Sequence, residues 1–176
     1  MIRGQDVVVL VKLHLVGAAD WTVRSLADDL GYDLAGVSRS LWRLATAGLF
    51  DPERRRPRAA QSEEFLIHAV KYVFPATLGA PSRGMPTAWA VPPLSEAIAA
   101  GDEPPPVWPH RGGEVRGFAV KPVHRLAVDA SMRDPGMREW LALLDALRVG
   151  EARERRLAAD HLRDRVRSAA HAGAAG

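Results

Sequence analysis

Residues 21–49 read WTVRSLADDLGYDLAGVSRSLWRLATAGL, and the spacing of their apolar residues predicts two helices joined by a tight turn. Thr22 and Asp33 are suited to cap the N-termini of the two helices, because their side-chain oxygens can accept hydrogen bonds from backbone N–H groups. Gly31 is suited to end the first helix, since glycine enters the left-handed backbone region at little cost. Many proteins use two helices in this order to place the second one in the major groove of DNA.

The second helix is predicted to bury one face and expose the other. Val37, Leu41 and Leu44 repeat at spacings of four and three residues, which predicts a buried stripe. The opposite face carries small polar and basic residues, and we expect Arg39 and Arg43 to face the groove. The alternative is that this polar face only contacts solvent.

A basic segment, DPERRRPR at 51–58, follows the second helix. Residues 34–58 hold six arginines against two acidic residues, although the net charge of the whole chain is only +3. Arginine suits bidentate contacts with phosphate and guanine. We expect the basic segment to bind backbone phosphates; the alternative is a solvated loop. The residues expected to contact DNA are Ser38, Arg39, Ser40, Trp42, Arg43, Arg54, Arg55, Arg56 and Arg58.

The runs LADDLG (26–31) and VSRSLWRLATAGLF (37–50) resemble the winged helix-turn-helix core of MarR-type transcriptional regulators. The residues that match in phase are Leu26, Ala27, Gly31, Val37, Ser38, Arg39, Leu44, Gly48 and Leu49. The resemblance implies a DNA-binding dimer with a basic β-hairpin, or wing, after the recognition helix. Two features depart from the family: residues 51–58 show no evident returning strand, and the family's long dimerisation helices have no similar counterpart in this sequence.

The remaining sequence predicts a mainly helical α+β protein. Its N-terminal winged helix-turn-helix domain would span 1–60, and its C-terminal oligomerisation or ligand- or partner-binding region 61–176. Further helices are expected at 5–16, 60–73, 94–100, 122–132, 135–150 and 151–170. We expect 74–93 to be ordered but irregular, 103–109 to be polyproline-like, and a short β-hairpin to join 107–108 to a strand at 115–120.

Several classes of function are not expected. The chain has no cysteine, so disulfides and thiolate chemistry are excluded. Glu64 and His68 have a spacing that could bind metal, but no second ligand pair supports it, and we expect neither metal nor cofactor. No nucleophile, phosphate loop or other catalytic motif indicates an enzyme. The longest apolar run, 7–11, is far too short to cross a membrane, and a cytoplasmic protein is expected.

The last two predicted helices suggest self-association. Trp140 and Leu147 bound an apolar stripe that also holds Leu141 and Leu144, and a thinner seam continues beyond it at Leu157, Leu162 and Val166. We expect a homodimer through these helices; the alternative is that they pack within their own chain. The aromatic residues Tyr72, Phe74, Trp89, Trp108 and Phe118 could line an effector pocket or form a core.

The sequence therefore predicts a sequence-specific regulator of transcription, a homodimeric repressor that binds double-stranded DNA. The alternative is a protein-interaction module, such as an autoregulating antitoxin, whose C-terminal region binds a partner protein. A third interpretation is a nucleic-acid-associated factor without sequence specificity. The sequence leaves open whether a small-molecule effector or a protein partner acts on the C-terminal region.

Overall fold

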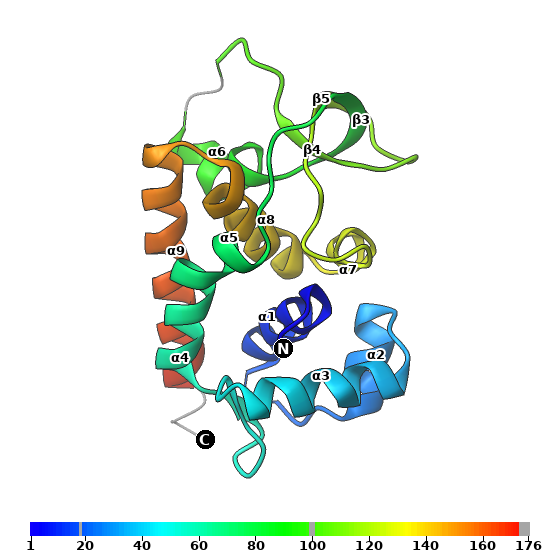
Figure 1. Ribbon diagram of the computed structural model, residues 1–176, viewed down its shortest axis with the longest axis vertical. Coiled ribbons are helices and arrows are strands. Elements are labelled where there is room, and N and C mark those ends of the chain that lie inside the picture. Colours follow the sequence, from blue (N-terminus) through cyan, green and yellow to red (C-terminus); the bar gives the residue numbers. More distant parts are fainter. Residues whose placement is uncertain (18, 99–100, 173–176) are drawn as a thin grey trace.

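The computed structural model describes residues 1–17, 19–98 and 101–172, which are mainly helical with two small sheets (Figure 1). The α-helices are α1 (Gly4–Val16), α2 (Val23–Leu30), α3 (Leu34–Thr46), α4 (Ala59–Glu64), α5 (Val70–Val73), α6 (Leu94–Ala97), α7 (Ala127–Arg133), α8 (Pro135–Val149) and α9 (Ala152–Ala172). A π-helical turn, η1 (Phe65–Ala69), joins α4 to α5, and a 3-10 turn, η2 (Ala88–Ala90), precedes α6. The strands are β1 (Phe50–Asp51), β2 (Arg56–Pro57), β3 (Pro81–Pro86), β4 (Pro106–Pro109) and β5 (Val115–Ala119).

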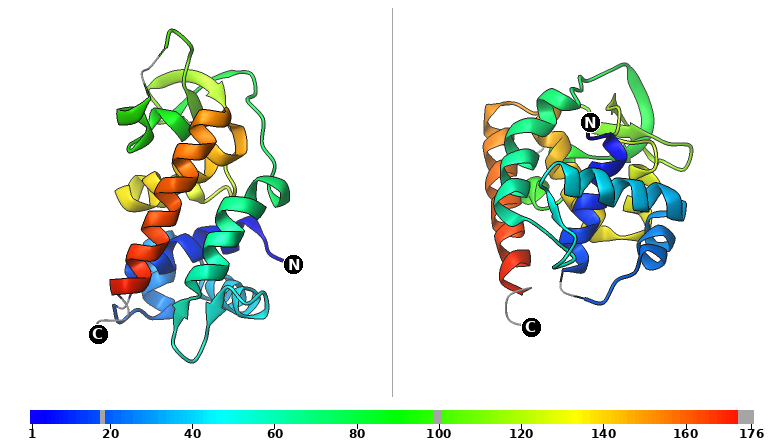
Figure 2. Two further views of the ribbon diagram at one scale, coloured as in Figure 1. Left: turned by 90° about the vertical axis from the view of Figure 1, so that its left-hand side faces the viewer. Right: turned by 60° about the horizontal axis from the view of Figure 1, so that its bottom comes forward.

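Helix α1 lies in the middle of the molecule, with other helices around it (Figures 1 and 2). Its residues 7–11 are fully buried, and it packs against α3, α8 and α9. A helix that is apolar all round is stable only when it is buried on all sides. This burial explains why a run of β-branched residues, which by itself would suit a strand, is helical as predicted.

Helices α2 and α3 form at the predicted positions and with the predicted caps. Thr22 Oγ1 accepts a hydrogen bond from the backbone N–H of Ser25 at 3.0 Å, and Asp33 Oδ1 accepts one from Gly36 at 2.6 Å. Gly31 has φ 67°, the left-handed conformation that ends α2. Both helices pack on α1.

A two-stranded hairpin follows α3, so the expectation that residues 51–58 contain no returning strand was wrong. Strand β1 pairs with β2 in antiparallel fashion, with Phe50 opposite Pro57 and Asp51 opposite Arg56. Asp51 Oδ1 accepts hydrogen bonds from two backbone N–H groups of the connecting loop, and Arg55 adopts φ 53°. The strands are two residues long, and the turn chemistry of the aspartate makes the reversal.

The second sheet corrects three predictions. Strand β3 lies within 74–93, which was expected to be irregular, and β4 lies within the expected polyproline segment. The predicted hairpin is wrong: β4 and β5 run parallel to each other, and β3 pairs with both in antiparallel fashion. Glycines allow this close ring, since a Cβ atom at Gly84 would lie 2.0 Å from the carbonyl oxygen of Trp108 and one at Gly117 would lie 1.9 Å from that of Pro105.

A buried carboxylate connects this sheet to α8. Asp145 accepts hydrogen bonds from Thr87 Oγ1 at 2.9 Å and from Trp108 Nε1 at 2.6 Å, and it pairs with Arg148 at 2.5 Å. Arg148 in turn donates to the carbonyl oxygen of Phe74 at 2.7 Å. These bonds hold the sheet region on the helical layer.

The apolar stripe of α8 is covered by its own chain. Trp140, Leu141, Leu144 and Leu147 are each at most 3% exposed, and Leu162 and Val166 of α9 are fully buried. Helix α9 runs along α8 and α4 (Figures 1 and 2). The expectation that this stripe and seam leave apolar surface for a partner protomer was therefore wrong, because α1, α4 and α9 fill that space.

The helix expected at 60–73 forms as α4 and α5 with the π-helical turn η1 between them, and the other helices differ from expectation at their ends. Helix α7 begins at Ala127 rather than 122, because the intervening residues form turns, and the predicted end of the 94–100 helix falls on 99–100, outside the described residues. One hydrophobic core draws on both sides of residue 60, and the domain division at that residue stays a prediction. No described helix combines the length and apolar character needed to cross a bilayer.

Candidate nucleic-acid interface

One face of α3 is exposed and carries part of the predicted recognition surface. Ala35, Ser38, Arg39 and Trp42 are exposed along it at helical spacing, and Trp42 keeps 69% of its surface in solvent. An exposed tryptophan at the centre of a helix is uncommon, because its ring ordinarily contributes to a core. The exposed face thus combines a hydroxyl, a guanidinium and a large aromatic ring.

Two predicted contact residues of α3 do not lie on this face. Ser40 is fully buried, and the Arg43 side chain is only 11% exposed. Arg43 donates to both carboxylate oxygens of Asp6 on α1, from Nε at 2.8 Å and from a terminal nitrogen at 2.6 Å. The hydrogen-bonded carboxylate raises the pKa of Arg43 above its ordinary value. The expectation that Arg43 faces the groove was wrong, because a buried acid on another helix binds it.

Arg39 remains available at the surface. Its guanidinium lies 3.8 Å from Asp33, and both side chains are mostly exposed, at 63% and 74%. Exposed pairs of this kind contribute little free energy, so a stronger partner can displace Asp33. A residue that contacts bases needs a guanidinium that is exposed and not tightly bound. Arg39 meets this requirement and Arg43 does not.

The arginines of the β1–β2 hairpin are not equivalent. The Arg55 guanidinium lies over the Trp21 ring, 4.6 Å from its centroid, and donates to the Trp21 carbonyl oxygen. Arg58 lies 3.9 Å from Asp51, whose pKa is lowered chiefly by the hydrogen bond from the backbone of Arg54. Arg55 thus fixes the hairpin to the segment before α2, while Arg54 and Arg58 remain exposed.

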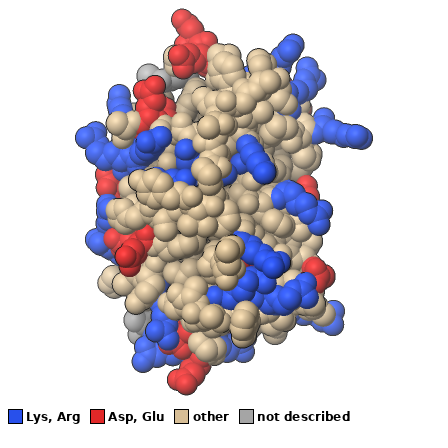
Figure 3. All heavy atoms as spheres, in the orientation of Figure 1, with Lys and Arg blue, Asp and Glu red and all other residues tan. Residues whose placement is uncertain are grey.

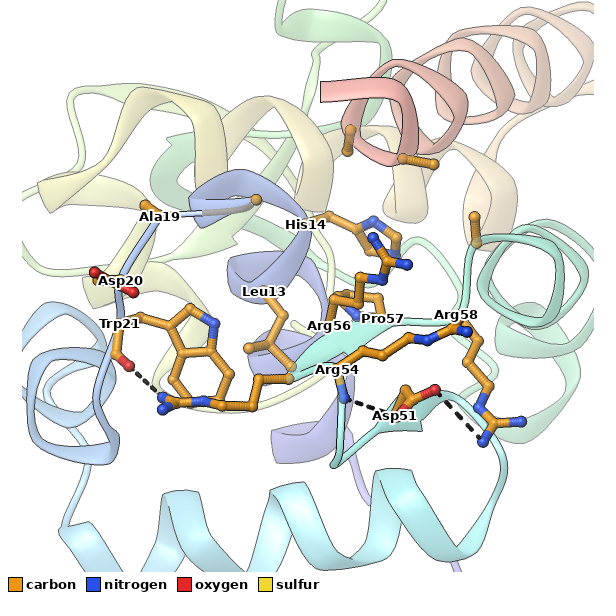
Figure 4. A pocket seen from close by; sticks show the side chains of 15 residues that line it. Leu13, His14, Ala19, Asp20, Trp21, Asp51, Arg54, Arg56, Pro57 and Arg58 are labelled. Atoms are coloured by element: carbon orange, nitrogen blue, oxygen red, sulfur yellow. Dashed lines mark hydrogen bonds and ion pairs between the residues drawn. The ribbon is translucent and has the colours of Figure 1, made fainter. Parts of the chain in front are cut away.

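A cavity of about 470 Å³ lies behind the hairpin. It is bounded by the hairpin, the C-terminal end of α1, the segment before α2 and the last turn of α9. Figure 4 shows Arg54 and Arg56 extending from the hairpin, while Arg58, also in the lining, turns toward Asp51. The four arginines that the sequence placed on DNA phosphates therefore also surround a cavity, an arrangement that no local pattern indicated.

His14 forms part of the cavity wall on the α1 side. It is 6% exposed and stacks on Trp140, with ring centroids 5.4 Å apart. Burial lowers the pKa of His14 to about 4, so the ring is neutral at neutral pH. Its Nε2 atom is buried and has no hydrogen-bond partner among the described residues. His14 carries no functional signal in the sequence, because it stands in an apolar run typical of a core helix.

The other candidate sites are not assembled. None of the five aromatic residues proposed for an effector pocket lines this cavity: Trp108 is in the core, and Tyr72 is 76% exposed. Within the described residues, no three histidine, aspartate or glutamate side chains gather where they could hold one metal ion.

The charge on the surface is distributed rather than concentrated. Figure 3 shows lysine and arginine side chains mainly around the edges of the face seen there, with a further group in the lower half, where Figure 1 places α1, α2 and α3. No family model, no curated protein and no solved structure matches the chain.

Proposed function

We propose that the protein is a DNA-binding regulator of transcription that places α3 in the major groove and the β1–β2 hairpin beside it, as a winged helix-turn-helix. The observation that carries the proposal is the exposed face of α3 with Ser38, Arg39 and Trp42. Helix α3 and the hairpin lie next to each other at one end of the molecule (Figures 1 and 2). Both elements are prominent when the lower end of the molecule is turned forward.

Each exposed side chain suits one contact. Arginine donates two hydrogen bonds to the acceptors of guanine, and an apolar ring contacts the methyl group of thymine. Ser38 can donate to a base or a phosphate. Arg54 and Arg58 extend from the hairpin and suit backbone phosphates, which add affinity without sequence preference. Ser40 and Arg43 have no part in the proposed interface, because Ser40 is buried and the Arg43 guanidinium is bound to Asp6.

The test is DNA binding by variants of α3. Arg39→Ala and Trp42→Ala should each weaken specific binding by about 1–3 kcal/mol in a gel-shift or anisotropy assay on DNA selected from a random duplex library. Arg155→Ala, which removes an exposed arginine from α9, is the matched control and should bind as the parent does. Equal affinity of the Arg39→Ala/Trp42→Ala double variant and the parent would rule out α3 as the recognition helix.

Homodimerisation and repression stay part of the proposal. Two copies would double the base contacts that one helix supplies, which operator specificity commonly requires. The α8 stripe cannot be the interface, since it is buried within the chain.

A second candidate function is the binding of a partner protein, as an autoregulating antitoxin does. Tyr72, Val73 and Leu78 keep 76%, 49% and 51% of their surface exposed at and after α5. Exposed apolar side chains close in sequence favour a protein contact. If this function is the correct one, Tyr72→Ser should abolish co-purification of a partner encoded beside the gene, while Arg39→Ala leaves it intact.

A further inference from the structure

The cavity behind the hairpin has the chemistry of a binding site. Its volume, about 470 Å³, lies within the range of small-molecule pockets, roughly 300–1,000 Å³. Four arginines line it against two aspartates. Of the two aspartates, Asp51 already accepts two backbone hydrogen bonds and lies beside Arg58. The wall is therefore cationic.

The opposite wall is apolar. Ala19, before α2, and Ala169 and Ala170 of α9 contribute aliphatic surface, and the fully buried Leu13 lies behind them. The residues come from segments far apart in the sequence, and the cavity exists only where these segments meet (Figure 4). A ligand that fills such a space has an anionic group at one end and an apolar body at the other.

His14 supplies an independent observation. Its Nε2 atom is buried at the cavity wall without a partner among the described residues. A buried polar atom without a partner costs free energy, commonly 1–3 kcal/mol, unless a ligand or a water satisfies it. The neutral imidazole can donate or accept one hydrogen bond where a ligand reaches the ring.

We propose that this cavity binds a small organic anion, a carboxylate or a phosphate ester. Its charged group lies on Arg54 and Arg58, and its apolar body lies against Ala19, Ala169 and Ala170. The site is separate from the exposed face of α3, and this proposal does not rest on the proposed DNA binding.

The test is direct binding without DNA, by calorimetry and thermal shift of the full chain at constant ionic strength. The probes are phenyl phosphate and benzoate, with inorganic phosphate and neutral benzyl alcohol as controls. We expect one or both organic anions to bind saturably and to raise the melting temperature. They should bind more tightly than either control compound, because only they contact both walls.

Three variants locate the site. Arg54→Gln should weaken binding of the organic anion about tenfold, the usual effect of losing one charge-assisted hydrogen bond. His14→Phe keeps the ring against Trp140 and removes the donor, so it should fold and bind several-fold more weakly. Arg116→Gln on β5 removes an exposed arginine elsewhere and should bind as the parent does.

The proposal is overturned if neither organic anion binds, or if inorganic phosphate or benzyl alcohol binds equally well. It is also overturned if Arg116→Gln loses as much affinity as Arg54→Gln, because the effect would then be one of net charge. A chain that binds the anion but not DNA would overturn the proposed function alone.

Discussion

At the residue scale, the pair of Arg43 and Asp6 determines how α3 is held. The Asp6 carboxylate is fully buried, and its oxygens accept bonds from Arg43 and from the backbone N–H of Arg3. Breaking a buried pair by removing one partner leaves an uncompensated charge in a medium of low polarity. The pair therefore links the exposed helix to the central one.

Arg43→Ala should lower the free energy of unfolding by about 3–5 kcal/mol, because the buried Asp6 carboxyl would lose its partner. Arg39→Ala, at the surface of the same helix, should change it by less than about 0.5 kcal/mol. Urea denaturation of both variants measures the difference. A stable Arg43→Ala protein that loses only DNA binding would return Arg43 to the recognition surface.

His14 makes stability depend on pH. The unfolded chain protonates this residue near its ordinary pKa of 6.5, whereas the folded protein keeps it neutral down to about pH 4. Between these values the unfolded state binds more protons, so the free energy of unfolding decreases as the pH falls. The loss due to His14 should reach roughly 3 kcal/mol at pH 4.

Denaturation of the parent and of His14→Phe at pH 7.5 and pH 4.5 isolates this contribution. The parent should lose more stability than the variant over this interval. Equal losses would mean that the ring is already accessible to protons in the folded state.

At the scale of elements, the hairpin and α9 are held in place by different contacts. The hairpin presents exposed arginines, and Arg55 fixes it to Trp21. Helix α9 covers α8 and α4, and its arginines 163 and 167 both bind Glu63 while Arg165 binds Glu139 at 2.6 Å. Removal of charge from the hairpin and removal of α9 should therefore have different effects.

Replacing Arg54 and Arg58 by glutamine should weaken specific and non-specific DNA binding alike. Each lost phosphate contact should reduce the slope of log K against log salt by about one unit. Titrations between low and moderate salt measure the slope. A variant that loses only its sequence preference, at unchanged slope, would show that these arginines read bases.

Truncation after Gly150 should prevent stable folding. It would expose the α8 side chains that α9 covers and would delete the fully buried Ala158, Leu162 and Val166. Leu162→Ala, a smaller change at the same place, should cost about 2–5 kcal/mol. Circular dichroism and thermal melting test both. A truncated chain that melts cooperatively near the temperature of the parent would show that α9 is dispensable for the core.

At the scale of the whole molecule, the cavity and the proposed DNA interface share the hairpin. An anion held by Arg54 and Arg58 would neutralise charges that would otherwise contact phosphates. Binding of the two ligands would then be coupled, and the coupling would be equal in both directions. The charge on the hairpin would transmit this coupling without a change of fold.

A saturating concentration of the organic anion that binds best should weaken DNA binding, and excess DNA should weaken anion binding by the same factor. Sodium sulfate at matched ionic strength is the control for screening. Sedimentation velocity in the same samples gives the number of protomers bound per duplex. Anion affinity that is unchanged by saturating DNA would show that the two sites are independent.

The sequence by itself determined the elements whose causes are local. The caps at Thr22 and Asp33, the end of α2 at Gly31 and the buried faces of α2 and α8 depend on residues within about four positions of each other. A pattern of apolar residues and cap residues is sufficient for these. It also indicated the exposed positions of Ser38, Arg39 and Trp42.

Only the tertiary structure decided which of these faces meet. The sequence pattern of Arg43 is that of a surface residue, but in the fold α1 places Asp6 against it. The sequence pattern of the α8 stripe is that of an interface, but in the fold α9 covers it. Strands β3 and β4, short and rich in proline, lack the alternation that marks a strand, and their pairing depends on glycines that let distant backbones approach. The cavity likewise requires α1, the hairpin and α9 together, because contacts between distant segments leave no periodic signal in the chain.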